Sequence, residues 1–338
     1  MTDNPNLPPR ESGDAVEALL GQASRRPRPP AKATADVRAA VHSQWQALVR
    51  GRRRRRRVVA AGLAAGLFTV AVAVTQLLSV DPTVPAPVAV SARQHGDVFL
   101  VGNQSELLPL SPASAVVAGQ TVLTSSDAGL GLDWHSGISV RVDASTRVEM
   151  TADNAIYLQT GRVYIDTASD ENAESLVVKT DVGTVTHVGT RYMVTVKDDE
   201  LTVAVRDGRV RIDGHYHDAA AQPGDQVRMQ GSARPVVDRL PRYGDTWRWT
   251  ETLAGALDVD GRPADAFLRW VGHETGYRLV YDDPATETTV RETRLKGRVD
   301  ADPRTELALR LMTMDLDYEI DAARGELRVR RRGGDAAD

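Results

Sequence analysis

One dipeptide in this chain combines residue types that can break a peptide bond. Gly189-Thr190 lies in the stretch HVGTRYMV. A threonine hydroxyl can attack the carbonyl carbon of the preceding residue, which converts the amide into an ester that water then hydrolyses. This reaction needs a strained peptide bond. The residues alone favour a simpler interpretation, in which the glycine only precedes a strand.

No other motif predicts catalysis. His215 and His217 could bind a metal through their imidazoles, but no third ligand lies nearby in the sequence, so a solvated loop is favoured. The chain has no cysteine, which excludes disulfides and thiolate-bound metals. It also lacks the glycine-rich phosphate and dinucleotide motifs and the serine-elbow motif. We therefore expect a protein that is not an enzyme and that holds no cofactor and no metal.

Gly189-Thr190 falls in a region, residues 95–213, whose pattern is all β. Polar and apolar residues alternate there with the period of two that is typical of half-buried strands. Gly183 and Gly189 are expected at turns or bulges, and Asp207-Gly208 is expected at the turn of a hairpin. Strands this short predict a sandwich, a barrel or a compact coil of strands. The expected strand regions are Ile138–Asp143, Arg147–Met150, Ala155–Asp166 in two runs split at Thr160-Gly161, Leu176–Lys197 and Leu201–Ile212.

Beyond Trp247 the pattern changes to a mixture of helices and strands. A helix is expected over Pro263–Thr275, with the proline at its first position and Gly276 after its end. Segments alternating in this way predict a small α+β domain of about 85 residues. Trp247, Trp249 and Trp270 are expected to pack at the boundary of this domain. The other expected elements are a helix with Asp302 as its cap and Pro303 at its first position, and the strands Tyr277–Tyr281, Leu295–Val299, Leu316–Ile320 and Glu326–Arg330.

An uncharged apolar run, Val58–Val80, directly follows six consecutive arginines, Arg52–Arg57. A helix of this length, at about 1.5 Å per residue, can cross a hydrocarbon core of about 30 Å. Basic flanks stay on the cytoplasmic side. The sequence therefore predicts a single-pass membrane protein with residues 1–57 in the cytoplasm and residues 81–338 in the periplasm. A cleaved signal peptide is disfavoured, because the apolar run is long and lies far from the N-terminus.

The charges divide along the same line. The formal net charge of the chain is −4. Residues 1–57 contain 13 basic and 5 acidic residues, a net charge of +8, and residues 58–80 are uncharged, so the remainder carries −12. An asymmetry of this kind is typical of a basic interaction segment attached to a separate domain.

Residues 1–57 contain two candidate helices whose apolar stripes cannot be buried within so short a segment. The second candidate helix, which spans residues 35–50, places Val37, Val41, Trp45 and Leu48 at helical spacing. We expect these four side chains to contact a partner protein, with Trp45 as the main contact, because buried aromatic residues dominate interface energies. The alternative is a tail whose second helix only extends the membrane helix.

The predicted fold is thus a single-pass membrane protein with a short helical cytoplasmic segment, an all-β periplasmic domain and a small α+β domain. The predicted boundaries are 1–57 for the cytoplasmic segment, 58–80 for the transmembrane helix, 81–94 for a linker, 95–240 for the β domain and 245–332 for the α+β domain.

The order of short motifs in the β region is similar to that of the FecR family of sigma-factor regulators. Two positions depart from the family pattern, because His135–Gly137 replaces Asp-Gly-Ser and Arg162 replaces an acidic residue. Residues 247–331 resemble the short domain shared by secretins and TonB-dependent receptors. The stretches that carry the FecR resemblance are Gly119–Val122, Ser136–Val142, Ala144–Val148, Leu158–Asp166, Val188–Val194, Val203–Val210 and Ala221–Asp225.

The resemblance implies an anti-sigma factor of the bacterial inner membrane. Such proteins hold an extracytoplasmic-function sigma factor through their cytoplasmic segment, although that segment is shorter here than the usual family domain. Their periplasmic part contacts the signalling domain of an outer-membrane TonB-dependent transducer, often in iron or siderophore uptake. The resemblance also implies self-cleavage between Gly189 and Thr190, which some members undergo.

Two other functions stay open. The chain could be a membrane-anchored envelope scaffold or a secretion-associated β-domain protein that does not regulate a sigma factor. It could also be an enzyme, which the missing catalytic site disfavours.

Overall fold

The computed structural model describes residues 86–102, 106–152, 154–167, 175–300 and 302–333. All of them belong to one compact unit, Val84–Asp338. The predicted cytoplasmic segment and the predicted transmembrane helix lie outside the described residues. Within the described part of the chain, no helix is both long enough and apolar enough to cross a bilayer.

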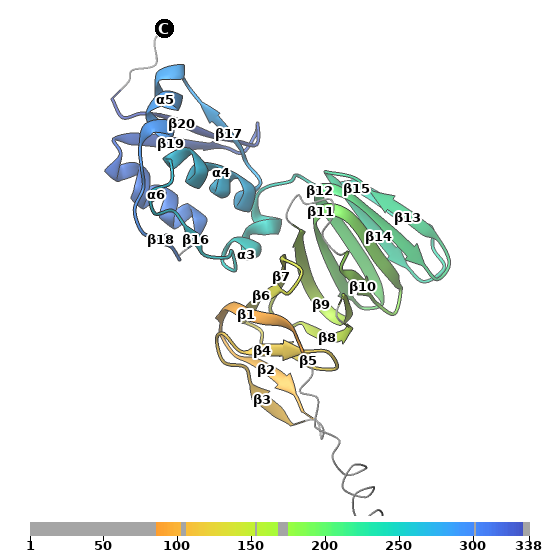
Figure 1. The fold of residues 1–338 in the computed structure, drawn as a ribbon. Helices are drawn as coiled ribbons and strands as arrows, with labels where there is room; N and C mark the ends of the chain where they lie inside the picture. Colours follow the sequence, from red (N-terminus) through yellow and green to blue (C-terminus); the bar gives the residue numbers. More distant parts are fainter. Residues whose placement is uncertain (1–85, 103–105, 153, 168–174, 301, 334–338) are drawn as a thin grey trace, which may run out of the picture. The chain divides into compact units, whose positions relative to one another are not determined.

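The first part of this unit is built from strands alone, which confirms the all-β prediction (Figure 1). The main sheet runs in the order β15-β14-β12-β11-β10-β9-β7-β6-β1-β4, and β2, β3, β5, β8 and β13 branch from it. The strands are β1 Pro87–His95, β2 Val98–Val101, β3 Leu107–Pro109, β4 Ala115–Val117, β5 Thr121–Thr124, β6 Gly129–Trp134, β7 Ile138–Val142, β8 Arg147–Ala152, β9 Ala155–Thr167, β10 Val177–Lys179, β11 Gly183–Lys197, β12 Glu200–Gly214, β13 Asp218–Ala221, β14 Asp225–Gln230 and β15 Val236–Arg239.

Alternating apolar residues form the core of this β domain. In β8, for example, Val148 and Met150 are fully buried, while Glu149 between them is only partly buried. The same alternation in β7, β9, β11 and β12 fills one continuous core with valine, leucine and isoleucine side chains. A row of β-branched residues at period two therefore determines which face of each strand is buried.

The longest strand pair, β11 with β12, corrects the hairpin prediction. Asp207-Gly208 is not a hairpin turn, because β12 continues through it as one strand. The turn that joins β11 to β12 is instead Asp198-Asp199, and both aspartates adopt positive φ angles, 51° and 60°. This is the backbone twist that tight two-residue hairpin turns require.

Two bulges interrupt the pairing of β11 with β12. Between the pairs Val188↔Arg209 and Arg191↔Asp207, two residues of β11 face one residue of β12. Between Arg191↔Asp207 and Tyr192↔Val205, Arg206 of β12 has no opposite residue. Each bulge adds one residue to one strand, so together they restore the original register.

Two further predictions change in the β domain. Ala155–Asp166 forms one strand rather than two runs, because β9 bends at Gly161 (φ 96°) and there exchanges its neighbour β8 for β7 and β11. The predicted linker, residues 81–94, overlaps β1. From Pro87 onward the chain is a strand, because Val88 and Ala89 are buried in the core between β4 and β6.

The second part of the unit is an α+β domain with its own core. A parallel pair, β17 with β20, and an antiparallel pair, β19 with β20, form its sheet, against which the helices pack (Figure 1). Its elements are the 3-10 helix η1 Asp245–Trp247, α3 Arg248–Glu251, β16 Leu257–Asp258, α4 Ala264–Thr275, β17 Arg278–Tyr281, α5 Pro284–Glu292, β18 Arg298–Val299, α6 Pro303–Thr313, β19 Leu316–Asp321 and β20 Glu326–Arg331.

Most of the helix ends predicted in this domain are confirmed. Asp302 caps α6 and Pro303 opens it, as predicted, and Gly276 ends α4 in the left-handed conformation. Pro263, however, is the N-cap of α4 rather than its first residue, since its ψ of 147° is extended. The predicted strand at 295–299 is reduced to β18. Helix α5 was not predicted, because it buries only Thr286 and Val290 and shows no apolar stripe.

The hairpin assignment can be tested by substitution. Asp199→Gly should raise the free energy of unfolding of residues 84–338 by up to about 1 kcal/mol, because glycine adopts positive φ without a steric cost. The measurement is urea unfolding followed by circular dichroism. Asp127→Gly is the matched control: Asp127 is a turn residue without positive φ, so its replacement should destabilise the domain. Equal effects of the two substitutions would contradict the assignment.

Candidate functional site

The bulge on β11 contains the predicted reactive dipeptide. Gly189 adopts a φ of 54° and is exposed, whereas Thr190 is only 1% exposed. The peptide bond between them therefore has its carbonyl side at the surface and its hydroxyl-bearing side in the interior. A left-handed residue at this point is easily accommodated only by glycine.

A neighbouring threonine holds the backbone of Thr190. The backbone N–H of Thr190 donates to Oγ1 of Thr167 at 2.7 Å, and the Thr167 hydroxyl donates to the carbonyl oxygen of Thr190 at 3.0 Å. Thr167 is the last residue of β9 and is 5% exposed. Its single hydroxyl thus replaces the ladder hydrogen bonds that the bulge removes.

The hydroxyl of Thr190 itself has no such partner. Its Oγ1 is buried and makes no hydrogen bond within the described part of the chain. An unpaired buried hydroxyl costs about 1–3 kcal/mol, so such groups are uncommon and call for an explanation. The residue that could act as the nucleophile is therefore also the one whose side chain is free to do so.

Gly208 of β12 lies directly against the Gly189-Thr190 bond of β11. A Cβ atom at this position would lie 2.3 Å from the carbonyl oxygen of Gly189 and 2.4 Å from Cγ2 of Thr190. Gly208 also has a positive φ of 76°. Any other residue would collide with the bond, so the glycine of the misassigned Asp207-Gly208 turn is required by the bulge instead.

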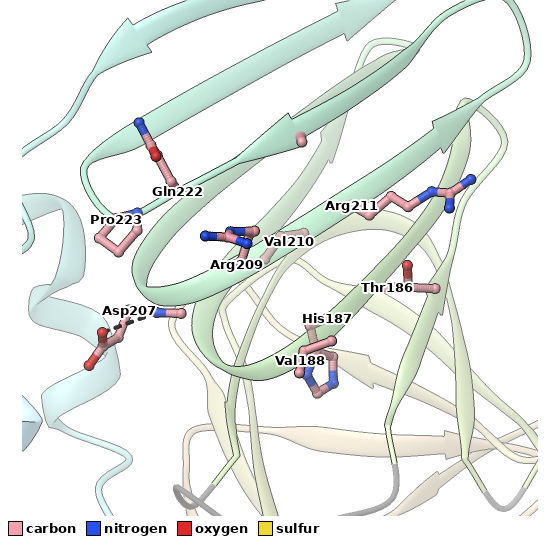
Figure 2. Close-up of a pocket in the computed structure, with 11 residues that line it drawn as sticks. Thr186, His187, Val188, Asp207, Arg209, Val210, Arg211, Gln222 and Pro223 are labelled. Atoms are coloured by element: carbon pink, nitrogen blue, oxygen red, sulfur yellow. Dashed lines mark hydrogen bonds between the residues drawn. The ribbon is translucent and has the colours of Figure 1, made fainter. Parts of the chain in front are cut away.

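A pocket of about 960 Å³ lies beside the bulge (Figure 2). Strands β11 and β12 supply Val188, Arg209 and Arg211, and the residues around β13 supply Gln222 and Pro223. Val188 is 77% exposed. Gly189 is exposed as well, so the carbonyl side of the Gly189-Thr190 bond faces solvent.

The interior side of the bulge is apolar and holds two further polar groups. His187 Nε2 accepts a hydrogen bond from the backbone N–H of Leu176, while its Nδ1 has no partner among the described residues. Burial lowers the pKa of His187 to about 4, so its imidazole is neutral at pH 7. Tyr192 packs against it with ring centroids 5.2 Å apart, and burial raises the pKa of Tyr192.

The opposite face of β7, β9, β11 and β12 carries buried charges. Arg141, Tyr164, Met193 and Ala204 are paired in one row across these four strands. Arg141 is 1% exposed and forms a 2.7 Å ion pair with Glu274 of α4. Burial alone would lower the pKa of Arg141, but the Glu274 carboxylate outweighs it and raises that pKa. The α+β domain thus supplies the negative charge that this face needs.

Arg206, the extra residue of the second bulge, joins the same contact. Its guanidinium lies 4.5 Å from the ring centroid of Trp247 and donates to the backbone carbonyl of Glu274 at 2.9 Å. Trp247 is fully buried and makes an edge-on contact with Tyr164. We call Arg141, Tyr164, Arg206, Trp247 and Glu274 the domain joint. Trp247 therefore lies at the boundary, as predicted.

The other two tryptophans, Trp249 and Trp270, lie in different places. Trp249 lies beneath the guanidinium of Arg162, 5.0 Å away, and so also joins the boundary to the β domain. Trp270 instead packs on Phe267 inside the α+β core, and its prediction was wrong.

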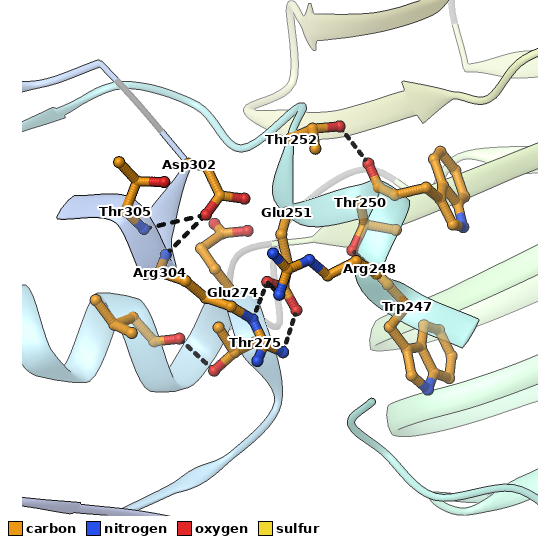
Figure 3. Close-up of polar contacts among 12 residues, drawn as sticks. Trp247, Arg248, Thr250, Glu251, Thr252, Glu274, Thr275, Asp302, Arg304 and Thr305 are labelled. Carbon is orange, nitrogen blue, oxygen red and sulfur yellow. Dashed lines mark hydrogen bonds and ion pairs between the residues drawn. The ribbon is translucent and has the colours of Figure 1, made fainter. Parts of the chain in front are cut away.

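A second ion pair, within the α+β domain, holds the short helix α3 that follows Trp247. Glu251 of α3 is fully buried, and its two carboxylate oxygens accept hydrogen bonds from Arg304 of α6 at 2.7 and 3.1 Å (Figure 3). Because the pair is bidentate, it fixes the angle of α3 as well as its position.

One trio at the joint has the spacing of metal ligands. Side-chain atoms of Asp166, His273 and Glu274 lie within 4.8 Å of one another. Burial alone would raise the pKa of Asp166, but its hydrogen bond with His273 and the charge of Arg141 lower it. Since these carboxylates already face an imidazole and a guanidinium, the trio fits an ion-pair network better than a metal site.

The remaining predicted residues lie apart from these features. The ring of His217 forms a hydrogen bond with the backbone carbonyl of Ser232, and His215 is exposed; neither histidine belongs to a group of potential metal ligands within the described residues. Val37, Val41, Trp45 and Leu48 lie outside the described residues. Sequence reasoning missed Thr167, whose role depends on a contact between strands 23 residues apart.

The joint yields a stability prediction. Glu274→Gln should lower the free energy of unfolding of residues 84–338 by about 3 kcal/mol or more, because Arg141 would keep a buried charge without its counter-ion. Urea unfolding measures the change. The control is Glu287→Gln, which breaks the exposed pair with Arg291 and should cost less than about 1 kcal/mol. Similar losses in both variants would contradict the role of the joint.

In comparisons with known proteins, a family model matches part of the chain. Residues 120–211 match the family model described as FecR protein. No curated protein matches the chain. Two crystal structures of a protein from Parabacteroides distasonis ATCC 8503, a candidate anti-sigma factor by name, are 16% identical, cover 62% of this chain and 98% and 97% of their own, and have TM-scores of 0.32. A cell surface anchoring domain is 22% identical, covers 19% of this chain and 86% of its own, and has a TM-score of 0.18.

The matched segment contains Thr167, the Gly189-Thr190 bond, Gly208 and both arginines of the domain joint. Residues 247–331, for which a resemblance to the secretin and TonB-receptor short domain was expected, lie outside it. Over residues 120–211, this chain is similar to the FecR family.

Proposed function

We propose that this chain is an anti-sigma regulator of an extracytoplasmic-function sigma factor. Residues 58–80 anchor it in the bacterial inner membrane, residues 1–57 bind the sigma factor in the cytoplasm, and the described unit lies in the periplasm. There it receives a signal from an outer-membrane TonB-dependent transducer, in iron or siderophore uptake. The FecR match over residues 120–211 is the observation that carries this proposal.

The charge pattern supports the proposal. The segment before the apolar run has a net charge of +8 and the chain beyond it −12, and six arginines mark the cytoplasmic flank. The joint supports a signalling role for the periplasmic unit, because it connects the β domain to the α+β domain through the buried Arg141–Glu274 ion pair. Force or binding on one domain is thereby transmitted to the other.

An envelope scaffold is the competing function. It would need the same membrane anchor and the same β domain, but it would leave residues 1–57 without a sigma factor. The two functions are therefore distinguished on the cytoplasmic side.

The sigma-factor proposal is tested by co-purification. The full chain, co-expressed with the candidate extracytoplasmic-function sigma factor, should retain it, and Trp45→Ala should weaken the affinity by about 2 kcal/mol, roughly thirtyfold, because a buried tryptophan dominates such an interface. Trp249→Ala, outside the cytoplasmic segment, is the matched control and should bind as the native chain does. If neither the native chain nor the variants retain the sigma factor, the scaffold function is favoured.

Self-cleavage at Gly189-Thr190 is a second candidate activity. The unpaired, buried Oγ1 of Thr190 at a left-handed bulge is the observation that favours it. Gly189, on the carbonyl side of the bond, is exposed to water, which the final hydrolysis consumes. Cleavage would divide the periplasmic unit into two pieces and prepare it for a proteolytic response.

This activity predicts two products from the purified full chain, the second beginning at Thr190. Thr190→Ala should remain intact, because it removes the attacking hydroxyl, together with the γ-methyl group. A denaturing gel and intact mass measure the outcome over a day of incubation. A native chain that remains as intact as Thr190→Ala would exclude self-cleavage.

A further inference from the structure

We propose that Thr167 is a positioning residue for cleavage of the Gly189-Thr190 bond. The inference rests on the proposed self-cleavage and names the residue that makes it possible. Thr167 does not touch the carbonyl carbon that is attacked. It acts through the backbone of Thr190, which it fixes, and through the Thr190 hydroxyl, which it leaves free.

The argument begins with what a buried threonine normally does. A threonine hydroxyl can hydrogen-bond its own or a neighbouring backbone group. At a bulge such groups are available, because the strand ladder is interrupted there. Without another partner, the N–H and C=O of Thr190 and the groups around them would compete for its own Oγ1.

Thr167 removes that competition. Its Oγ1 has one proton and two lone pairs, and both functions are used on Thr190: it accepts from the N–H at 2.7 Å and donates to the C=O at 3.0 Å. Both backbone groups of Thr190 are then satisfied. The Oγ1 of Thr190 is left without a partner among the described residues, as the bond-breaking step requires.

The two hydrogen bonds from Thr167 also make the two residues of the reactive bond differ, because Thr190 is held in place and Gly189 is not. Thr190 is held on the nitrogen side by two hydrogen bonds and by burial. Gly189, on the carbonyl side, is exposed, and a Cβ built on it would meet no described atom within 4 Å. The carbonyl carbon of Gly189 can therefore move toward the fixed hydroxyl of Thr190. Gly208 packs against this peptide bond and has no side chain that would block the movement.

The chemistry balances without any further reagent except water. A bond forms between Oγ1 of Thr190 and the carbonyl carbon of Gly189, the carbon–nitrogen bond breaks, and the hydroxyl proton ends on the nitrogen. The product is an ester with a free Thr190 amine. Water then adds to the ester carbonyl, which releases the Gly189 carboxylate and restores the Thr190 hydroxyl.

Replacement of the Thr167 hydroxyl tests the assignment. Thr167→Val has nearly the same shape but no hydroxyl, and it should slow cleavage of the full chain at least about tenfold, because a small misplacement of the attacking group has a large effect on rate. Thr167→Ser keeps the hydroxyl and should restore cleavage to within about twofold of native. The readouts are intact mass and a denaturing gel, with and without hydroxylamine to cleave the ester.

The matched control is Thr180→Val. Thr180 is also a buried threonine whose hydroxyl bonds its local backbone: Oγ1 donates to the carbonyl of Gly183 at 2.8 Å and accepts from the N–H groups of Val182 and Gly183. Both valine variants should lose stability in urea unfolding. Only Thr167→Val should lose cleavage, which a merely structural role of the hydroxyl would not produce.

The outcomes separate the two proposals. A native chain that does not cleave even with hydroxylamine overturns self-cleavage and this assignment together. A native chain that cleaves while Thr167→Val cleaves equally fast overturns the assignment alone. If Thr167→Val does not fold by circular dichroism, Thr167→Ala takes its place; slow cleavage there, restored in Thr167→Ser, supports the assignment, and equal cleavage in the alanine and serine variants overturns it.

Discussion

Two complementary bulges in the pairing of β11 with β12 are the constraint on which the rest of this unit depends. An extra residue on β11 turns Thr190 inward and exposes Gly189, and an extra residue on β12 turns Arg206 toward the α+β domain. The second bulge restores the register that the first one shifts, so the residues beyond both bulges keep their pairing and their faces. The candidate cleavage site and the contacts of Arg206 in the domain joint therefore both arise from the bulges in this one strand pair.

The joint explains how charged residues come to lie on a covered sheet face. Glu274 stabilises Arg141 and Arg206 there through its carboxylate and its backbone carbonyl, and Tyr164 and Trp247 contribute aromatic faces. Buried ion pairs of this kind contribute little net stability but penalise every arrangement that leaves one partner alone. Their effect is to specify one position of the α+β domain against the β domain.

The sequence predicted the elements better than their connections. Period-two alternation identified the strands, and the caps at Asp302 and Gly276 identified helix ends, because these signals are local. Asp207-Gly208 was misassigned because a bulge and a hairpin both need a left-handed residue, and only the pairing partner distinguishes them. Alternation predicted a strand over Ile138–Asp143, but it could not reveal that the α+β domain covers Arg141. The role of Thr167 was equally hidden, since it depends on a contact between distant strands.

The position of the Gly189-Thr190 bond in the middle of β11 has a mechanical consequence. A chain broken there would consist of two polypeptides that still share one sheet, because the later half of β11 lies between β9 of the first piece and β12 of the second. The first piece would also keep the opening half of β11, paired with the far end of β12. Such pieces come apart only when several ladders shear at once, so the severed molecule would stay assembled until an outside load pulled on it.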